Sequence, residues 1–321
     1  MIPVLIDCDP GQDDAIALLL ALASPELDVV GVTTVAGNQT VDKTTVNALK
    51  VLELAGRSDI PVARGADRPL VGDLVVADDA HGATGLDGPD LPAPTSQPVE
   101  EHAVDFLAKK LGSAERPLVL VAIGPLTNVA LLLASYPETA SKIERIVLMG
   151  GAIGAGNQTA SAEFNIWTDP EAAFRVFESG LDLTMIGLDV TNKALLTAED
   201  AAGLRDSGRI GEPVAAMLDF YVGFYTGFYE HGGAPIHDAV AVAHAFRPEL
   251  VTTLDRNVAI ERGAGLCRGR TVVDMRRRTI LPDPNAHVGV DIDVPSFREL
   301  LLGRLGSFDE QTSSRRPRHT R

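Results

Sequence analysis

The fold is decided by the stretch IPVLIDCDPGQDDA, which runs from Ile2 to Ala15. Its first part, Ile2–Ile6, is continuously apolar apart from Pro3, as expected of a buried strand. Pro10-Gly11 turns the chain sharply, and a helical pattern follows from Asp13 to Ala23. A buried strand that leads directly into a helix is typical of the repeating unit of a parallel α/β sheet.

Short apolar runs and helical patterns continue to alternate along the chain. Strands are expected at Leu27–Val35, Leu118–Ala122, Arg145–Met149 and Leu183–Gly187, and helices at Val41–Ala55, Leu126–Leu133 and Pro170–Glu178. Apolar strands separated by helices predict an α/β fold, with an open, mostly parallel, Rossmann-like sheet and helices on both faces. After Thr197 the pattern predicts a helical C-terminal portion. Extra strands are expected there at Val251–Ile260, Thr271–Met275 and Val288–Val294.

The length and composition fit one large folded unit. Of the 321 residues, 45% are hydrophobic, which is enough for a substantial core. We expect a single domain over residues 1–312. Residues 313–321 carry four arginines among Ser, Pro and Thr, and they predict a disordered basic tail. The segment Gly65–Pro98 is rich in Gly, Pro and Asp, which predicts a functional loop.

The charge balance argues against two classes of partner. Lys and Arg total 28 against 44 Asp and Glu, so the formal net charge is −16. Such a surface repels nucleic acid and anionic membranes, and we expect neither as a partner. Two cysteines, Cys8 and Cys267, make no disulfide framework. Because the first residues do not resemble a signal peptide and no apolar run is long enough to cross a bilayer, we expect a cytoplasmic protein.

The residues that follow each strand are the candidate site, because ligands of a parallel sheet bind beyond the carboxyl ends of its strands. Four carboxylates, Asp7, Asp9, Asp13 and Asp14, crowd into eight positions after the first strand. Carboxylates this close repel one another unless a cation lies between them, and oxygen ligands favour Ca²⁺ or Mg²⁺. Helix capping is the alternative, and it accounts for one or two of the four.

Polar side chains also follow the later strands. Asn38 comes after the second strand, and Asn157, Glu163 and Asn165 share the loop after Arg145–Met149. Amides and a carboxylate in this arrangement suit the hydroxyls of a sugar, with ordinary loop hydrogen bonds as the alternative. The Gly-Pro turn after Leu118–Ala122 leaves a backbone carbonyl at the strand end, which is a natural Ca²⁺ ligand.

Residues from the second half of the chain complete the candidate set. Asp238 can close the cation site from the opposite wall, and His237 beside it can act as a general acid. Their alternatives are a helix-capping aspartate and a packed histidine. His81, in the long loop, is a second polar candidate. Three tyrosines recur every four residues, which is helical spacing, and so form one stripe: Tyr221, Tyr225 and Tyr229. We expect two of them in the core and one facing a substrate.

Taken in this order, these segments resemble the nucleoside hydrolase family of the inosine-uridine preferring type, from Ile2 to about Phe297. The most specific segment is Asp7–Asp14. Further matching segments are Gly37–Thr40, Met149–Gly151, Ala162–Asn165 and His237-Asp238. The resemblance implies Ca²⁺-dependent hydrolysis of the N-glycosidic bond of a small-molecule ribonucleoside, giving ribose and free base, by a homodimer or homotetramer.

The resemblance also implies a role for each site residue. Asp9 would bind Ca²⁺ and act as the general base on the attacking water, and His237 would protonate or polarise the departing base. The other Ca²⁺ ligands would be Asp14, Asp238 and the backbone carbonyl of Ile123. The ribose hydroxyls would contact Asp13, Asn38, Asn157, Glu163 and Asn165, and the base would lie near His81 and Tyr229. Asn192 departs from the pattern, since the family more often has His there.

Two other functions remain open from the sequence. A Mg²⁺ phosphatase of the haloacid dehalogenase type also begins with a strand and an Asp-x-Asp pair. Here, however, Gly11 stands where a hydroxyl residue is usual, and no clear lysine motif for a phosphate follows. A non-catalytic nucleoside- or ribose-binding protein would keep the pocket without the chemistry, and the presence of both Asp9 and His237 argues against it.

Overall fold

A computed structural model describes residues 1–226, 228, 232–278 and 281–313. The strands of its main sheet are β1 (Ile2–Cys8), β2 (Leu27–Thr34), β3 (Val62–Arg64), β4 (Leu118–Ala122), β5 (Ile143–Met149), β6 (Leu183–Ile186), β9 (Val251–Arg256) and β12 (Ala286–Ile292). They lie in the order β3-β2-β1-β4-β5-β6-β12-β9. Each described pair of neighbours is parallel except β12 and β9. The predicted open, mostly parallel sheet is therefore confirmed.

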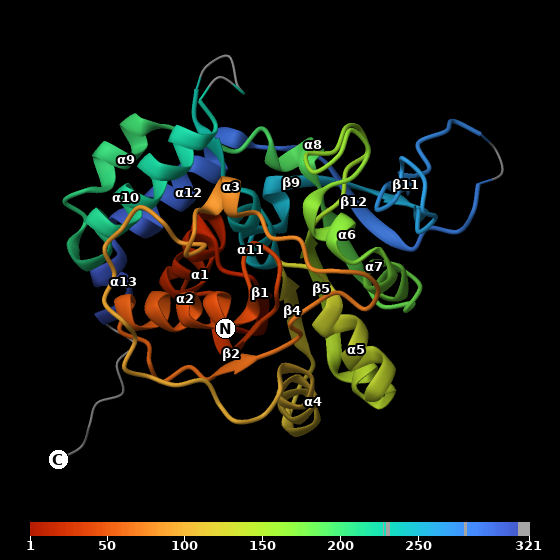
Figure 1. The fold of residues 1–321 in the computed structure, drawn as a ribbon, viewed down its shortest axis with the longest axis horizontal. Helices are drawn as coiled ribbons and strands as arrows, with labels where there is room; N and C mark the ends of the chain where they lie inside the picture. Colours follow the sequence, from red (N-terminus) through yellow and green to blue (C-terminus); the bar gives the residue numbers. More distant parts are fainter. Residues whose placement is uncertain (227, 229–231, 279–280, 314–321) are drawn as a thin grey trace.

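Helices cover both faces of this sheet, as the alternating pattern predicted (Figure 1). They are α1 (Gln12–Ala23), α2 (Val41–Leu54), α3 (Asp78–His81), α4 (Ala103–Ser113), α5 (Thr127–Ser135), α6 (Phe164–Thr168), α7 (Pro170–Phe177), α8 (Leu188–Thr191), α9 (Ala198–Leu204), α10 (Gly208–Phe224), α11 (His237–Phe246), α12 (Val294–Gly306) and α13 (Phe308–Ser313). Alternate residues of β1 divide the core. Val4 and Ile6 pack with α1, α2, α10 and α11, whereas Leu5 packs with α4, α5 and α7.

The C-terminal portion is helical, as predicted, but it also extends the main sheet. β12 pairs in parallel with β6, and β9 then adds an antiparallel edge. The expected strand Val251–Ile260 is divided, because its end, β10 (Val258–Ile260), leaves the main sheet and pairs with β11 (Thr271–Val273). Asn285 holds this departure in place, since its side chain bonds both the N–H and the carbonyl of Val258.

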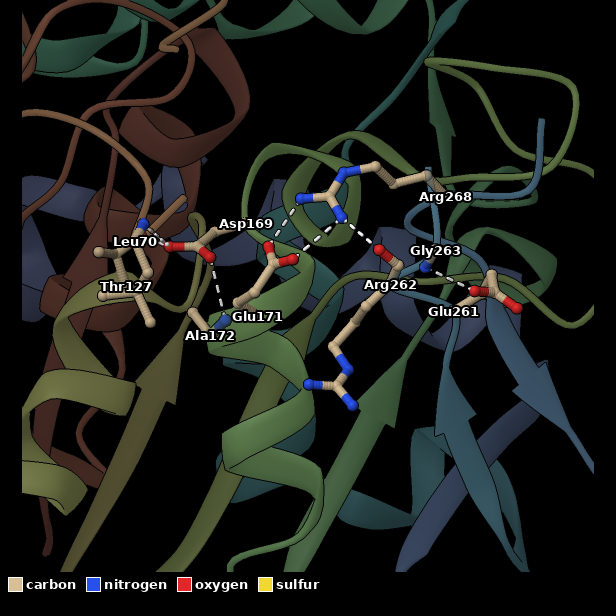
Figure 2. Close-up of polar contacts among 9 residues, drawn as sticks. All are labelled: Leu70, Thr127, Asp169, Glu171, Ala172, Glu261, Arg262, Gly263 and Arg268. Atoms are coloured by element: carbon tan, nitrogen blue, oxygen red, sulfur yellow. Dashed lines mark hydrogen bonds and ion pairs between the residues drawn. The ribbon is translucent and has the colours of Figure 1, made fainter. Parts of the chain in front are cut away.

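The arm formed by β10, β11 and their connection is fastened to α7 (Figure 2). The guanidinium of Arg268 donates to both carboxylate oxygens of Glu171, at 2.9 and 2.7 Å. Arg262 lies over the ring of Phe174, 3.6 Å from its centroid. Arg268 also donates to the backbone carbonyl of Arg262 at 2.6 Å. These contacts join the arm to the helix that follows the loop of predicted sugar ligands.

The predicted functional loop Gly65–Pro98 is anchored at several points. Asp169, which caps α7 by accepting from the N–H of Ala172, also accepts from the N–H of Leu70 and the hydroxyl of Thr127 (Figure 2). Further along, the loop forms α3, which ends at the buried His81. The loop thus carries one predicted site residue into the interior.

The structure bears only in part on the predictions about membrane spans and about the C-terminal tail. Within the described residues, no helix combines the length and the apolar character that crossing a bilayer requires. The predicted disordered tail, 313–321, lies outside the described residues except for Ser313, which ends α13.

Candidate functional site

A cavity of about 400 Å³ lies among the segments that follow the carboxyl ends of the strands. It adjoins β1 and β4, the point where the strand order reverses, and such a switch point is where open α/β sheets bind ligands. Its volume suits a small molecule. Of the predicted site residues, its wall includes Asp13, Asn38, His81, Ile123, Asn157, Glu163, Asn165, His237 and Asp238.

Three carboxylates meet in this site. Asp13, Asp14 and Asp238 are buried, and each offers one oxygen within 4.8 Å of the others. A hydrogen bond joins the carboxyl groups of Asp14 and Asp238. Burial, followed by neighbouring negative charge, raises the pKa of Asp13 to about 8, and burial raises that of Asp14 to about 6. A divalent cation among these oxygens would keep the carboxylates ionised together.

Asp9 lies against this group. Its Oδ2 accepts from the backbone N–H of Asn38 at 2.6 Å, and its Oδ1 is buried without a hydrogen-bond partner in the described part of the chain. A Cβ on Gly37 would lie 2.1 Å from Oδ2, so this close approach requires glycine. Burial and then the charge of Asp14 raise the pKa of Asp9 well above its usual value. An oxygen of Asp9 without such a partner is able to accept a proton.

Asp14 is both a helix cap and a member of the cluster. As the third residue of α1, it accepts from the backbone N–H groups of Gly11 at 3.0 Å and Asp9 at 3.1 Å. The side-chain amide of Asn38 donates to it at 2.9 Å. Asn38 therefore holds Asp9 and Asp14 in one arrangement. Asp14 has both roles that the sequence left open, since it caps the helix and belongs to the cluster.

Asp7 does not join the cluster, although it stands in the same crowded motif. Its Oδ1 accepts from the hydroxyl of Thr33 at 2.5 Å and from the side-chain amide of Asn128 at 2.8 Å. Burial raises its pKa to about 7, and the two hydrogen bonds act in the opposite direction. The motif therefore supplies three carboxylates to the site and one to the interior beside it.

Glu163 and Asn157 have structural partners as well as a place in the cavity wall. Glu163 caps α6, because its carboxylate accepts from the backbone N–H groups of Gly151, Asn165 and Ile166 at 2.8, 2.9 and 3.1 Å. Burial nonetheless raises its pKa to about 7. Asn157 is exposed, and its Oδ1 accepts from the N–H of Phe164. The alternative of loop hydrogen bonds is thus realised for both.

Asn165 connects the ends of two strands. Its side-chain amide donates to the carbonyl of Ile123 at 3.0 Å, just beyond β4, and to that of Met149 at 3.2 Å, at the end of β5. The carbonyl of Ile123, an expected cation ligand, therefore accepts a hydrogen bond from a buried amide, and both residues belong to the cavity wall.

His237 and Asp238 begin α11 and belong to the cavity wall. The Nδ1 of His237 lies 2.7 Å from the hydroxyl oxygen of Thr191, whereas its Nε2 is buried and lacks a partner among the described residues. Burial lowers the pKa of His237 to about 4, which leaves the ring neutral at pH 7. The carboxyl group of Asp238, the second residue of α11, is hydrogen-bonded to that of Asp14 and so belongs to the cluster.

Aromatic side chains from α10 and its end line the cavity next to His81. The ring of Tyr221 stacks on His81 with centroids 5.5 Å apart, and Tyr225 meets Tyr221 edge-on at 5.1 Å. Tyr221 is buried, yet both tyrosines belong to the cavity wall. Tyr229, the third member of the expected stripe, lies outside the described residues.

Sequence reasoning missed several residues of this neighbourhood. Gln12 contacts His81, Asn128 holds Asp7, and Thr191 holds His237. Phe224 and Phe228 line the cavity, and their spacing of four residues beside the tyrosines was a usable signal. The three partners carried no such signal, because each is defined only by what it contacts.

Comparison with known proteins shows which family this chain resembles. Residues 4–299 match the family described as inosine-uridine preferring nucleoside hydrolase. A Citrobacter koseri protein named pyrimidine-specific ribonucleoside hydrolase RihA is 52% identical over 312 residues, which cover 96% of this chain and 99% of that protein. The solved structure of a purine-preferring ribonucleoside hydrolase from Gardnerella vaginalis is 36% identical, with a TM-score of 0.90 and coverage of 97% and 99%.

Proposed function

The chain belongs to the inosine-uridine preferring nucleoside hydrolase family, and we propose how its own residues perform the hydrolysis of a ribonucleoside. It is an N-ribosyl hydrolase, which hydrolyses the N-glycosidic bond of a ribonucleoside and so releases ribose and a free base. The phosphatase and the non-catalytic binding protein find no support among these relatives. One observation carries the assignment of roles. Asp9 is a buried aspartate with one oxygen that has no partner among the described residues, and it adjoins three converging carboxylates.

The cation of this metal-dependent family is proposed to be Ca²⁺, held by Asp9, Asp14, Asp238 and the carbonyl of Ile123. The donor set consists of oxygens, which hard cations prefer. One of them, the Oδ1 of Asp9, is buried and lacks a partner in the described chain, as does the Oδ1 of neighbouring Asp13. When bound, the ion would supply positive charge that acidifies a water and attracts ribose hydroxyls. The oxygens of Asp13, Asp14 and Asp238 lie within 4.8 Å of one another, so Asp13 is proposed to adjoin the ion as well.

The protein's part in the reaction begins with the attacking water. Asp9 is proposed to take its proton through Oδ1, the oxygen that accepts nothing from the described chain. The hydrogen bond from Asn38 to Oδ2 holds the carboxylate in place while this occurs. A fixed base of this kind accelerates a reaction by roughly 10²–10⁴-fold.

The ribose is proposed to lie over the carboxylates. Its hydroxyls would bond to Asp13, Asn38, Asn157, Glu163 and Asn165, which share the cavity wall. Positive charge grows at the anomeric carbon as the bond to the base breaks, and buried carboxylates stabilise that charge. One base and one acid on opposite sides of a sugar is also the arrangement of inverting glycosidases.

His237 is proposed to assist the departing base from the opposite wall. The hydroxyl of Thr191 lies at Nδ1, which leaves Nε2 for the base. Because the ring is neutral at pH 7, it assists by a hydrogen bond from Nε2 to the departing base, which takes its proton from solvent water.

Replacing His237 by Ala tests this role. With uridine, we expect kcat to fall by about 10²-fold, as expected for loss of an acid. With 4-nitrophenyl riboside, whose leaving group departs as an anion, the loss should shrink to severalfold. Steady-state kinetics on both substrates provide the measurement. An equal loss on the two would argue that His237 holds the ribose rather than the base.

The base is proposed to be a pyrimidine. The relative at 52% identity is named pyrimidine-specific, whereas the purine-preferring structure is 36% identical. The aromatic wall of Tyr221, Phe224, Tyr225 and Phe228 suits a planar base of either kind, so the preference rests on overall similarity. A homodimer or homotetramer is also proposed, from the resemblance alone.

A reducing-sugar assay on a panel of ribosides tests the whole proposal. Uridine and cytidine should release ribose faster than inosine and adenosine. Treatment with a chelator should abolish release, and added Ca²⁺ should restore it more fully than Zn²⁺, because the site offers oxygen ligands. Release that persists after exhaustive chelation would exclude the cation. Hydrolysis of 4-nitrophenyl phosphate without any release of ribose would revive the phosphatase alternative.

A further inference from the structure

Gln12 is a fully buried polar residue that the proposed mechanism does not use. Its Nε2 donates to two backbone carbonyls of the long loop, that of His81 at 3.2 Å and that of Asp87 at 2.9 Å. Carbonyl oxygens only accept hydrogen bonds. The amide group of Gln12 must therefore turn its NH₂ end toward the loop, which fixes the direction of its oxygen.

That oxygen decides where His81 carries its hydrogen. The Oε1 of Gln12 lies 2.6 Å from the Nδ1 of His81. Because an amide oxygen only accepts, Nδ1 must be the donor. Burial, followed by the charge of His237, lowers the pKa of His81 to about 3, so the ring is neutral and has a single N–H. Its second nitrogen, Nε2, is then an acceptor.

Two close neighbours, Gly11 and Tyr221, also hold the ring of His81 in position. Gly11 approaches it so closely that an added Cβ would lie 2.3 Å from Nδ1, and Tyr221 stacks on it at 5.5 Å. With Nδ1 turned to Gln12, Nε2 lies on the other side of the ring. His81 belongs to the cavity wall, so Nε2 is the ring nitrogen that remains to meet a ligand there.

We propose that Gln12 is a positioning residue that sets the tautomer of His81, so that the cavity presents an acceptor nitrogen to the base and selects bases that offer an N–H. The inference rests on the proposed function for its ligand, a pyrimidine ribonucleoside. Uracil carries a ring N–H that such an acceptor can bind. In 3-methyluridine a methyl group replaces that hydrogen, and the hydrogen bond is lost.

The tautomer can be measured without activity. In protein labelled with ¹⁵N-histidine, the ring nitrogen shifts distinguish a protonated from an unprotonated nitrogen, and the His81 signals are those missing from His81→Gln. We expect the hydrogen on Nδ1 in the unaltered enzyme and its loss from Nδ1 in Gln12→Met, which keeps the side-chain length but cannot accept an N–H hydrogen bond of this strength. A hydrogen on Nε2 in the unaltered enzyme would overturn the proposal with no variant needed.

The consequence for specificity is measured as kcat/KM on uridine and 3-methyluridine. We expect the unaltered enzyme to prefer uridine by at least about tenfold, the value of one hydrogen bond to a buried partner. Gln12→Met should lower kcat/KM for uridine by about tenfold and leave 3-methyluridine nearly unchanged. A uridine preference that survives in Gln12→Met would contradict the role of the tautomer.

Asn47 offers a matched control. Its side-chain amide is also buried and also ties the loop, donating to the carbonyls of Pro10 and Thr84 at 3.0 Å each. Asn47→Leu therefore loosens the same loop while the Gln12–His81 contact remains. The ratio of its kcat/KM for uridine to that for 3-methyluridine should equal the ratio of the unaltered enzyme. A ratio near one would show that the effect comes from loosening the loop. If neither nucleoside is hydrolysed, the proposed function fails, and the nitrogen shifts still decide the tautomer.

Discussion

Asp9→Asn is expected to lower kcat for uridine by at least about two orders of magnitude. Asparagine keeps the size of the side chain and can still accept from the N–H of Asn38, but its amide cannot take a proton from water. The measurement is steady-state hydrolysis at saturating Ca²⁺. Calorimetric titration of the same variant with Ca²⁺ separates the loss of a general base from the loss of a Ca²⁺ ligand. Only the loss of a ligand weakens Ca²⁺ binding as much as it lowers turnover.

Asp7→Asn is the control for that substitution. It makes the same chemical change two residues earlier, at a carboxylate that bonds Thr33 and Asn128. Its Oδ2 has no partner among the described residues, so an NH₂ group there displaces no hydrogen bond. We expect its kcat to stay within a few-fold of the unaltered enzyme. Near-full turnover by Asp9→Asn, or equal losses in the two variants, would refute the assignment of the base.

The 2′-hydroxyl of the substrate should matter even more. We expect kcat/KM for 2′-deoxyuridine to lie about 10⁴-fold below that for uridine, because a site built to bond a hydroxyl leaves buried groups unsatisfied without it. Asp13 is the clearest such group, since its Oδ1 is buried and has no partner in the described chain. Competition between the two nucleosides in one mixture, followed by chromatography of the nucleosides that remain, measures the ratio directly.

A substrate altered only in its base is the control for the residues proposed to bind the ribose. 5-Methyluridine changes the base and leaves the sugar intact, so it should be hydrolysed within about tenfold of uridine. Asp13→Ala should narrow the gap between uridine and 2′-deoxyuridine. Similar rates for these two substrates with the unaltered enzyme would remove Asp13 and its neighbours from the sugar site.

Much of the fold could be predicted because its signals are local. The strand, turn and helix of residues 2–23 follow from apolar runs, a Pro-Gly turn and helical spacing, and the structure places β1 and α1 there. The same patterns located β2, β4, β5 and β6 to within two residues at each end. Their order in the sheet was not readable, since the insertion of β12 between β6 and β9 depends on partners from distant parts of the chain.

The sequence by itself also determined that an acidic cluster stands at the end of the first strand, because a strand end and the first helical turn are neighbours in any βα unit. Only the tertiary structure decided which carboxylates converge. Asp13 joins Asp14 and Asp238, while Asp7 turns to Asn128, 121 residues away. Likewise Gln12 meets His81 across 69 residues. Such choices depend on which groups packing buries together, since a buried polar atom takes whichever partner the closed fold brings within reach.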